Sequence, residues 1–334
     1  MTSGGQSSAR QNRTMRCRER PRIRSVVGRG GRVPEARWVE EAETVTLSED
    51  TGAITVRSGE MIRLDLNGKT IYNSQGDRDA VTVEPGGYLY ITGTGQIINA
   101  GAMSLIFNEG ECVIDGAIEM NSDSRSYTVI NHGTMLLSGG VKISCSNTCS
   151  SLLQNGYYEY GSGSKRTGHI SGAAYPLMLI LSGTYEGGRI SVKNADAGIC
   201  RIYGGEFGGA ENAVLKNWAD LAIYGGEFRS GKYCLVLAKR IKNGDRCLGV
   251  TKIYGGTFEA NPESKRTLIV LSEGTDYDRF PTHGETYLYG GSFRGFEKLY
   301  GSLCSPRAVL EISEKATFTP KELRAGAERS DGSQ

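Results

Sequence analysis

The chain has 334 residues, of which 38% are hydrophobic and 23% charged, a balance that excludes global disorder. Glycine occurs 47 times, about twice its usual share, but the 8 prolines are too few for collagen or a proline-rich linker. The net charge of +2 conceals a basic head, because residues 1–34 carry nine Arg and one acidic residue, whereas the rest of the chain is mildly acidic.

At the two ends of the chain we expect a flexible Arg-rich extension over 1–38 and a flexible tail over 320–334, with one folded region at 39–319 between them. The head is also compatible with a tether to nucleic acid or an anionic surface, but the acidic body is expected not to bind nucleic acid. The longest run of Leu, Ile, Val and Met is the five residues Leu177–Leu181, so we expect no membrane span. The first thirty residues show no apolar stretch of the kind found in secretion signals.

The body repeats a short motif of the form apolar-Tyr-Gly-Gly-x-Phe. Its four clearest copies begin at Ile202, Ile223, Ile253 and Leu288. Weaker copies place apolar anchors, in chain order, at Leu66, Ile91, Ile114, Leu137, Leu181 and Ile312. Most anchors are 21–25 residues apart, the length of one coil with three short strands and three turns. We therefore predict an all-β fold, a single-stranded right-handed parallel β-helix (solenoid) of about ten coils.

Asparagine recurs at one place in the repeat, at the end of a short apolar strand. The five copies are Asn108, Asn131, Asn155, Asn194 and Asn217. Three of them lie six residues before their anchor. Their constant place predicts a ladder of hydrogen-bonded amides running from coil to coil, with ordinary turn chemistry as the alternative.

The repeat also sorts the aromatic residues by face. Side chains alternate along a strand, so the phenylalanines should form one interior column. Its members are Phe207, Phe228, Phe258, Phe293 and Phe318, with Tyr185 as its first ring. The tyrosines that follow the anchors should point outward, and they are Tyr203, Tyr224, Tyr254 and Tyr289. Such a row suits the apolar faces of sugar rings, and it also stabilises neighbouring strands without any ligand.

Three repeats carry extra residues, all at the same turn, in loops 156–178, 239–250 and 273–286. In a stacked fold these loops would leave from one edge, where insertions either serve binding or are simply tolerated. Four tyrosines in them join the outward row as candidate carbohydrate contacts: Tyr157, Tyr158, Tyr160 and Tyr277.

An acidic pair, Glu206 and Glu227, shares one repeat position, so the two side chains should lie about 5 Å apart. That spacing suits a retaining glycosidase or a Ca²⁺ ion. The next coils carry Thr257 and Ser292 instead, which favours an ordinary solvated pair. No metal-ligand spacing or catalytic motif occurs among the eight cysteines and three histidines, so we expect no metal site and no cofactor other than Ca²⁺, and we assign no catalytic residue.

Three stretches resemble a known family. The runs Val45–Ser48, Ile62–Ile71 and Val83–Gly93 look like those of pectate-lyase-like right-handed parallel β-helix proteins of bacterial surfaces and phage virions, and the Tyr-Gly-Gly-x-Phe repeats are similar to the same group. The resemblance covers about residues 40–318 and implies the architecture. Members of this group include polysaccharide lyases, hydrolases, adhesins and phage tail proteins. Its lyases carry clustered acidic Ca²⁺ ligands, a cluster that this sequence does not show.

These observations favour a non-catalytic β-helix that binds carbohydrate or serves as a surface or virion structural element. Expected partners are a polysaccharide or surface glycan, virion or cell-surface proteins, and further copies of the chain. The expected location is the cell surface or a phage virion, with the cytoplasm as the alternative. One alternative function is a protein–protein scaffold. The other is a tailspike-type lyase or glycoside hydrolase, whose nearest candidate residues are Glu206, Glu227, Asp276, Asp278 and Lys239.

Overall fold

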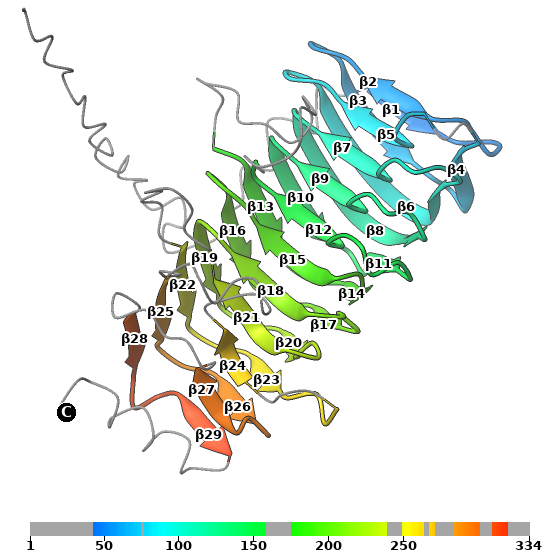
Figure 1. Cartoon of the computed structure of the whole chain (residues 1–334). Helices are drawn as coiled ribbons and strands as arrows, with labels where there is room; N and C mark the ends of the chain where they lie inside the picture. The colour runs from blue at the N-terminus through cyan, green and yellow to red at the C-terminus, as the bar shows by residue number, and fades with distance from the viewer. Residues whose placement is uncertain are drawn as a thin grey trace, which may run out of the picture. The chain divides into compact units, whose positions relative to one another are not determined.

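The computed structural model describes residues 43–74, 77–157, 175–238, 249–263, 267–270, 284–300 and 309–319. The chain divides into two units, Met1–Glu41 and Ala42–Gln334, and every described residue belongs to the second. The described residues form strands and turns and contain no helix (Figure 1). The first strand begins at Glu43, slightly later than the predicted start of the folded region, and the last ends at Thr319.

Each repeat contributes up to three strands, one to each of three faces, which we name after the residues that mark them. The anchor face holds β1 (Glu43–Thr46), β3 (Met61–Asp65), the first half of β6 (Tyr88–Asn99) and of β8 (Glu111–Ser122), β10 (Thr134–Ser138), β13 (Leu177–Ile180), β16 (Ile199–Ile202), β19 (Asp220–Ile223), β22 (Gly249–Ile253), β25 (Gly284–Leu288) and β28 (Val309–Ile312).

The phenylalanine face follows the anchor face in each repeat. It holds β4 (Lys69–Asn73), the second halves of β6 and β8, β11 (Lys142–Cys145), β14 (Thr184–Gly187), β17 (Glu206–Gly208), β20 (Glu227–Arg229), β23 (Thr257–Glu259), β26 (Ser292–Arg294) and β29 (Thr317–Thr319). The asparagine face holds β2 (Ile54–Val56), β5 (Val81–Val83), β7 (Ile106–Asn108), β9 (Val129–Asn131), β12 (Leu153–Asn155), β15 (Ile190–Asn194), β18 (Ala213–Asn217), β21 (Cys234–Ala238), β24 (Thr267–Val270) and β27 (Lys298–Tyr300).

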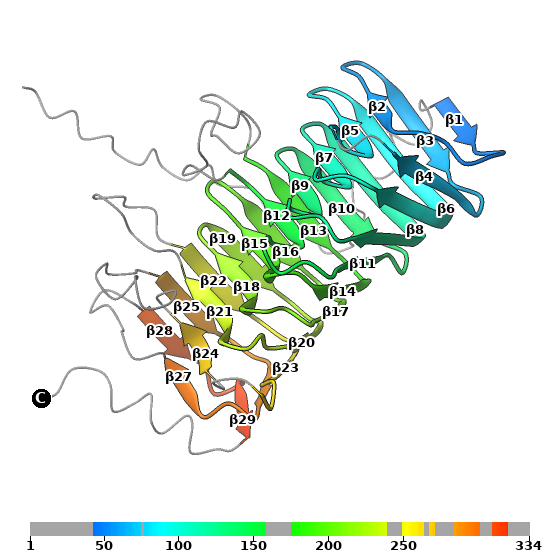
Figure 2. The same ribbon diagram turned by 45° about the vertical axis from the view of Figure 1, so that its right-hand side comes forward.

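Strands of successive repeats lie side by side in chain order on each face (Figure 2). All pairings between the strands of the described residues are parallel, and equal positions of neighbouring repeats face each other, as Ile202 faces Ile223 and Phe207 faces Phe228. The anchor and phenylalanine faces form one 19-stranded sheet because β6 and β8 run through both, and the asparagine face is a separate 10-stranded sheet. This arrangement is compatible with an open solenoid.

The predicted interior column of aromatic rings is confirmed. Tyr185 stacks on Phe207 with ring centroids 4.7 Å apart, and the column continues at spacings of 4.6–5.1 Å to Phe318. These rings are buried, and they pack in one apolar cluster with the inward residues of the other two faces. No single repeat encloses this core, so the stacking of repeats provides most of the apolar burial.

The predicted asparagine ladder is also confirmed. Each amide nitrogen donates to the amide oxygen of the next copy, from Asn108 to Asn131 at 2.7 Å and onward through Asn155 and Asn194 to Asn217. The last amide nitrogen donates to the hydroxyl oxygen of Thr251 at 2.9 Å. All five asparagines are buried, so the ladder satisfies polar groups that water does not reach.

Two predicted anchors were wrong. Leu64, not Leu66, faces Ile91 across the anchor face, and Ile180, not Leu181, faces Leu137 and Ile202. Every residue of the Leu177–Leu181 run is apolar, so the hydrophobic pattern there could not distinguish the inner from the outer side of the strand. Because side chains alternate, the shift of one residue places Leu181 on the outer surface.

Candidate functional site

The outer surface of the anchor face carries an exposed row of four tyrosines, each directly after the last residue of its strand. We call Tyr203, Tyr224, Tyr254 and Tyr289 the tyrosine row. The first three side chains are 40%, 44% and 44% exposed, and Tyr289 is half-buried. Neighbouring ring centroids lie 4.8, 5.0 and 5.1 Å apart, so the row spans about 15 Å. Burial of large aromatic side chains is favourable, so a row left exposed is a candidate contact surface.

The Gly-Gly pair after each tyrosine explains why Tyr points outward and the following Phe inward. A Cβ on Gly225 would lie 2.6 Å from the backbone oxygen of Tyr203, so only glycine lets the two repeats approach this closely. Gly226 then has φ near +109°, which side chains disfavour, and this turns the chain into the phenylalanine face. The motif therefore sets both aromatic columns at once.

Within the tyrosine row the rings are stacked on one another. The angles between neighbouring ring planes are 10°, 4° and 30°. Tyr224 and Tyr254 therefore turn their faces towards neighbouring rings and offer solvent mainly their edges and hydroxyl groups. The expected platform for the apolar faces of sugars is thus limited, because the row covers most of those faces itself.

The hydroxyl groups of Tyr203 and Tyr289 remain protonated donors at neutral pH. Burial raises the pKa of Tyr203 above its ordinary value, Tyr224 adds to the rise, and Arg201 opposes it. Desolvation likewise raises the pKa of Tyr289, with a further rise from Glu311. Arg201 is itself held on this surface by Asp220, whose carboxylate accepts a hydrogen bond at 2.8 Å.

Aliphatic side chains extend the surface beyond the tyrosines, and the sequence analysis missed them. Val113, Leu136 and Leu179 occupy consecutive outward positions of β8, β10 and β13, and all three are half-buried. Leu181 adjoins Tyr203 in the column of the row. The signal that could have revealed them is the unbroken apolar run Leu177–Leu181, since a strand with apolar residues on both sides reads this way.

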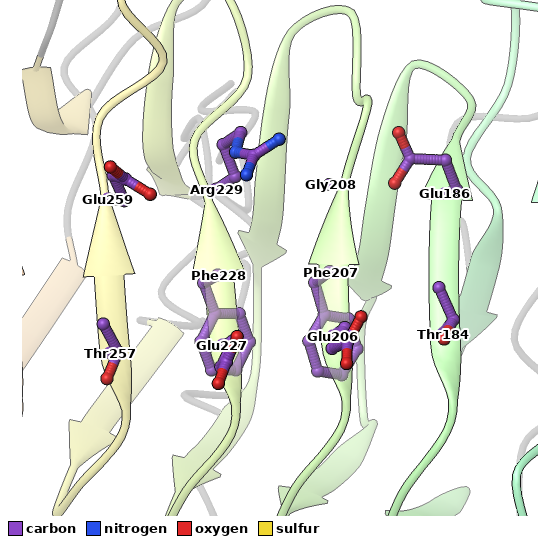
Figure 3. Close-up of a pocket in the computed structure, with 10 residues that line it drawn as sticks. All are labelled: Thr184, Glu186, Glu206, Phe207, Gly208, Glu227, Phe228, Arg229, Thr257 and Glu259. Atoms are coloured by element: carbon purple, nitrogen blue, oxygen red, sulfur yellow. The ribbon is translucent and has the colours of Figure 1, made fainter.

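The predicted acidic pair lies on the outer surface of the phenylalanine face. Glu206 faces Glu227 across β17 and β20, and Thr184 and Thr257 flank them in the same column. A depression of about 160 Å³ lies at this place. Figure 3 shows the residues that line it, with Glu186 and Arg229 on either side of Gly208. The missing side chain at Gly208 opens the depression. No ion pair joins Glu206 or Glu227 to a described residue.

Of the predicted loop contacts, the structure describes Tyr157, and Tyr157 does not join the row. Tyr157 is 2% exposed, and its ring packs against His132 at 4.7 Å, so it is unavailable to a ligand at the surface. Tyr158, Tyr160 and Tyr277 lie outside the described residues, as do Asp276, Asp278 and Lys239. The loop bounds also change, because β13, β22 and β25 begin inside the predicted loops. All three insertions still fall between the asparagine and anchor faces.

Comparisons with known proteins provide no identification, since no family model, curated protein or solved structure matches the chain. The described residues gather no cluster of three or more His, Cys, Asp or Glu side chains suited to a metal ion. They also contain no helix that is long and apolar enough to cross a membrane.

Proposed function

We propose that the second unit is a single-stranded right-handed parallel β-helix of about ten coils. Its support is the parallel, in-register pairing of every repeat with the next on three faces. Crossovers between parallel strands of one sheet are right-handed in nearly all proteins. The resemblance to pectate-lyase-like proteins in the first half of the body points to the same architecture.

We further propose that the protein is a non-catalytic binder of polysaccharide or surface glycan and acts as a cell-surface or virion element. The observation that carries this proposal is the tyrosine row, an aromatic column along four successive repeats that is exposed in three of them and half-buried in the fourth. Tyrosine combines an apolar ring with a polar end, which is the combination that sugar surfaces require.

The ligand would lie lengthwise along the row, across the strands. The ring centroids recur about every 5 Å, and the hydroxyl groups at the ends of these rings can donate hydrogen bonds to the repeating oxygens of a linear glycan. The ring edges and the aliphatic surface from Val113 to Leu181 would cover the less polar parts of the chain. A regularly spaced row favours a repeating polymer over a compact small molecule.

The test is binding of the full chain to a glycan array, followed by polysaccharide pull-down. A double variant, Tyr224→Ala with Tyr254→Ala, should lose binding, because it interrupts the middle of the row. Tyr72→Ala is the matched control, since Tyr72 is also 44% exposed but lies on the phenylalanine face. Equal binding by the double variant and the control would refute the assignment of the site, and absence of glycan binding by the parent protein would refute the function.

The depression around Glu206 and Glu227 supports a second candidate, a polysaccharide-degrading enzyme of the tailspike type. Retaining glycosidases place two carboxyl groups about 5 Å apart, close to the spacing of paired parallel strands. The same pair could hold Ca²⁺. Release of reducing ends from a polysaccharide panel, abolished by Glu206→Gln or Glu227→Gln, would support this candidate. No turnover with or without added Ca²⁺ would exclude it for that panel.

A further inference from the structure

The tyrosine row has two ends, and they differ. The column that contains the row continues in both directions, with Leu181 before Tyr203 and Ser313 after Tyr289. The backbone nitrogen of Ser313 donates to the oxygen of Leu288 at 2.9 Å, as that of Tyr289 donates to Ile253 at 2.7 Å. Ser313 is therefore the next position of the column, with the same backbone setting but a small side chain.

This difference decides which ring face of the row is left uncovered. Tyr224 and Tyr254 have a ring on each side, and the outer side of Tyr203 adjoins the branched Leu181. No described ring follows Tyr289 in the column, because Ser313 stands where the next ring would be. Among the described residues of the column, only the small side chain of Ser313 adjoins this face of the half-buried Tyr289.

Polar groups suited to sugar hydroxyls surround this position. Tyr287 lies beside Tyr289 with ring centroids 5.8 Å apart and planes at 15°, so the aromatic end of the row is two rings wide. Glu311 faces Tyr287 in the next strand, which puts a carboxylate acceptor beside the space above Ser313. The hydroxyl of Tyr287 is 3.1 Å from the carboxylate of Glu285, to which it donates.

We propose that one ring of the bound glycan occupies the vacant position above Ser313 and stacks on Tyr289, with Glu311 accepting from its hydroxyl groups. This inference rests on the proposed carbohydrate-binding function and names the part of the site that holds a sugar face. The remaining tyrosines contact the rest of the polymer through their edges and hydroxyl groups. Tyr289 is the anchoring residue, and the small side chain of Ser313 is what keeps the position open.

The test fills the position with a protein ring. Ser313→Tyr would add a fifth ring to the row and should weaken binding of a glycan selected on the array at least about tenfold, or about 1.4 kcal/mol. Thr319→Tyr, the matched control, adds a tyrosine to the same end repeat at an exposed position of the phenylalanine face and should leave the affinity within about twofold. Ser313→Ala keeps the position open and should also bind normally. Far-UV circular dichroism and the thermal midpoint establish that each variant is folded.

A second pair of variants keeps the proposal testable if Ser313→Tyr does not fold. Tyr289→Ala should weaken binding more than Tyr203→Ala, because the column places the small side chain of Ser313 next to Tyr289 but the branched Leu181 next to Tyr203. Normal glycan binding by Ser313→Tyr, or equal losses of affinity in Tyr203→Ala and Tyr289→Ala, would overturn the stacking position. The proposed function would still stand in that case if the Tyr224→Ala, Tyr254→Ala double variant lost binding. Absence of binding by the parent protein would overturn both.

Discussion

The asparagine ladder makes a quantitative prediction for the variant Asn155→Ala. Asn155 is fully buried, and its amide nitrogen donates to Asn194 at 2.9 Å and to the backbone oxygen of Ile199 at 3.0 Å. Its amide oxygen accepts from Asn131 at 2.7 Å. Alanine removes these three hydrogen bonds and a longer one, at 3.4 Å, to the backbone oxygen of Pro176, and it leaves the amide oxygen of Asn194 without this donor.

The expected loss follows from these contacts. A buried hydrogen bond contributes about 1 kcal/mol, and an acceptor left unsatisfied costs about 1–3 kcal/mol. We therefore expect Asn155→Ala to lower the free energy of unfolding by roughly 4–6 kcal/mol. Because domains are stable by only about 5–15 kcal/mol, the effect should be large.

The assay is urea unfolding followed by far-UV circular dichroism, with hydrogen exchange to locate the change, since stacked repeats can unfold in segments. Asn121→Ala is the control, because Asn121 is an exposed asparagine whose side chain accepts one hydrogen bond, from Ser144 at 2.6 Å. The free energy of unfolding of Asn121→Ala should fall by less than about 1 kcal/mol. If both variants unfold at the same urea concentration, the ladder does not contribute the stability that its hydrogen bonds indicate.

Two further predictions concern the start of the ladder and the buried thiols. Among the described residues, the buried amide oxygen of Asn108 has no hydrogen-bond partner, and Val83 faces Asn108 in the neighbouring strand. Val83→Thr should therefore raise the urea midpoint, whereas the control Val81→Thr, at a buried position that faces Ile106, should lower it. A lower midpoint for both variants would show that the new hydroxyl does not reach Asn108. Burial raises the pKa of the thiols of Cys112 and Cys200 to about 12, against about 8.5 in an unfolded chain. The stability that each protonated thiol contributes is fully present below about pH 8.5 and is lost as the pH rises towards 12. At pH 10 the free energy of unfolding should already be lower by about 2 kcal/mol for each thiol. A Cys112→Ala, Cys200→Ala variant should therefore show a flatter decline of the urea midpoint between pH 7 and pH 10, and an equally steep decline would contradict the assignment.

Strong, regular repeats made several parts of the fold predictable from sequence. The Tyr-Gly-Gly-x-Phe spacing placed Phe228 inside and Tyr224 outside, because a strand alternates its sides and the glycine pair has few backbone alternatives. The constant place of Asn131 and its equivalents likewise indicated the ladder. Prediction was wrong at Leu181, where apolar residues on both sides of the strand left its register unspecified by the pattern.

The candidate site depended more on tertiary structure. Sequence placed the tyrosines in one column, but not the orientation of their rings, which is set by packing against the neighbouring repeats. It also placed Tyr157 among the candidate contacts, and the structure buries it against His132. Tyr287 was not singled out, because it lies outside the repeated motif, although side-chain alternation puts it on the same side of the chain as Tyr289, two positions further on.

By itself, then, the sequence determined the repeat, the inner and outer aromatic columns and the amide ladder, since these follow from local spacing and side-chain alternation. Only the tertiary structure decided which ring faces stay open, because a ring is covered by residues some two dozen or more positions away along the chain. Whether Tyr289 meets another ring or the small side chain of Ser313 is a property of the stacked repeats, and it has no signature within the motif itself.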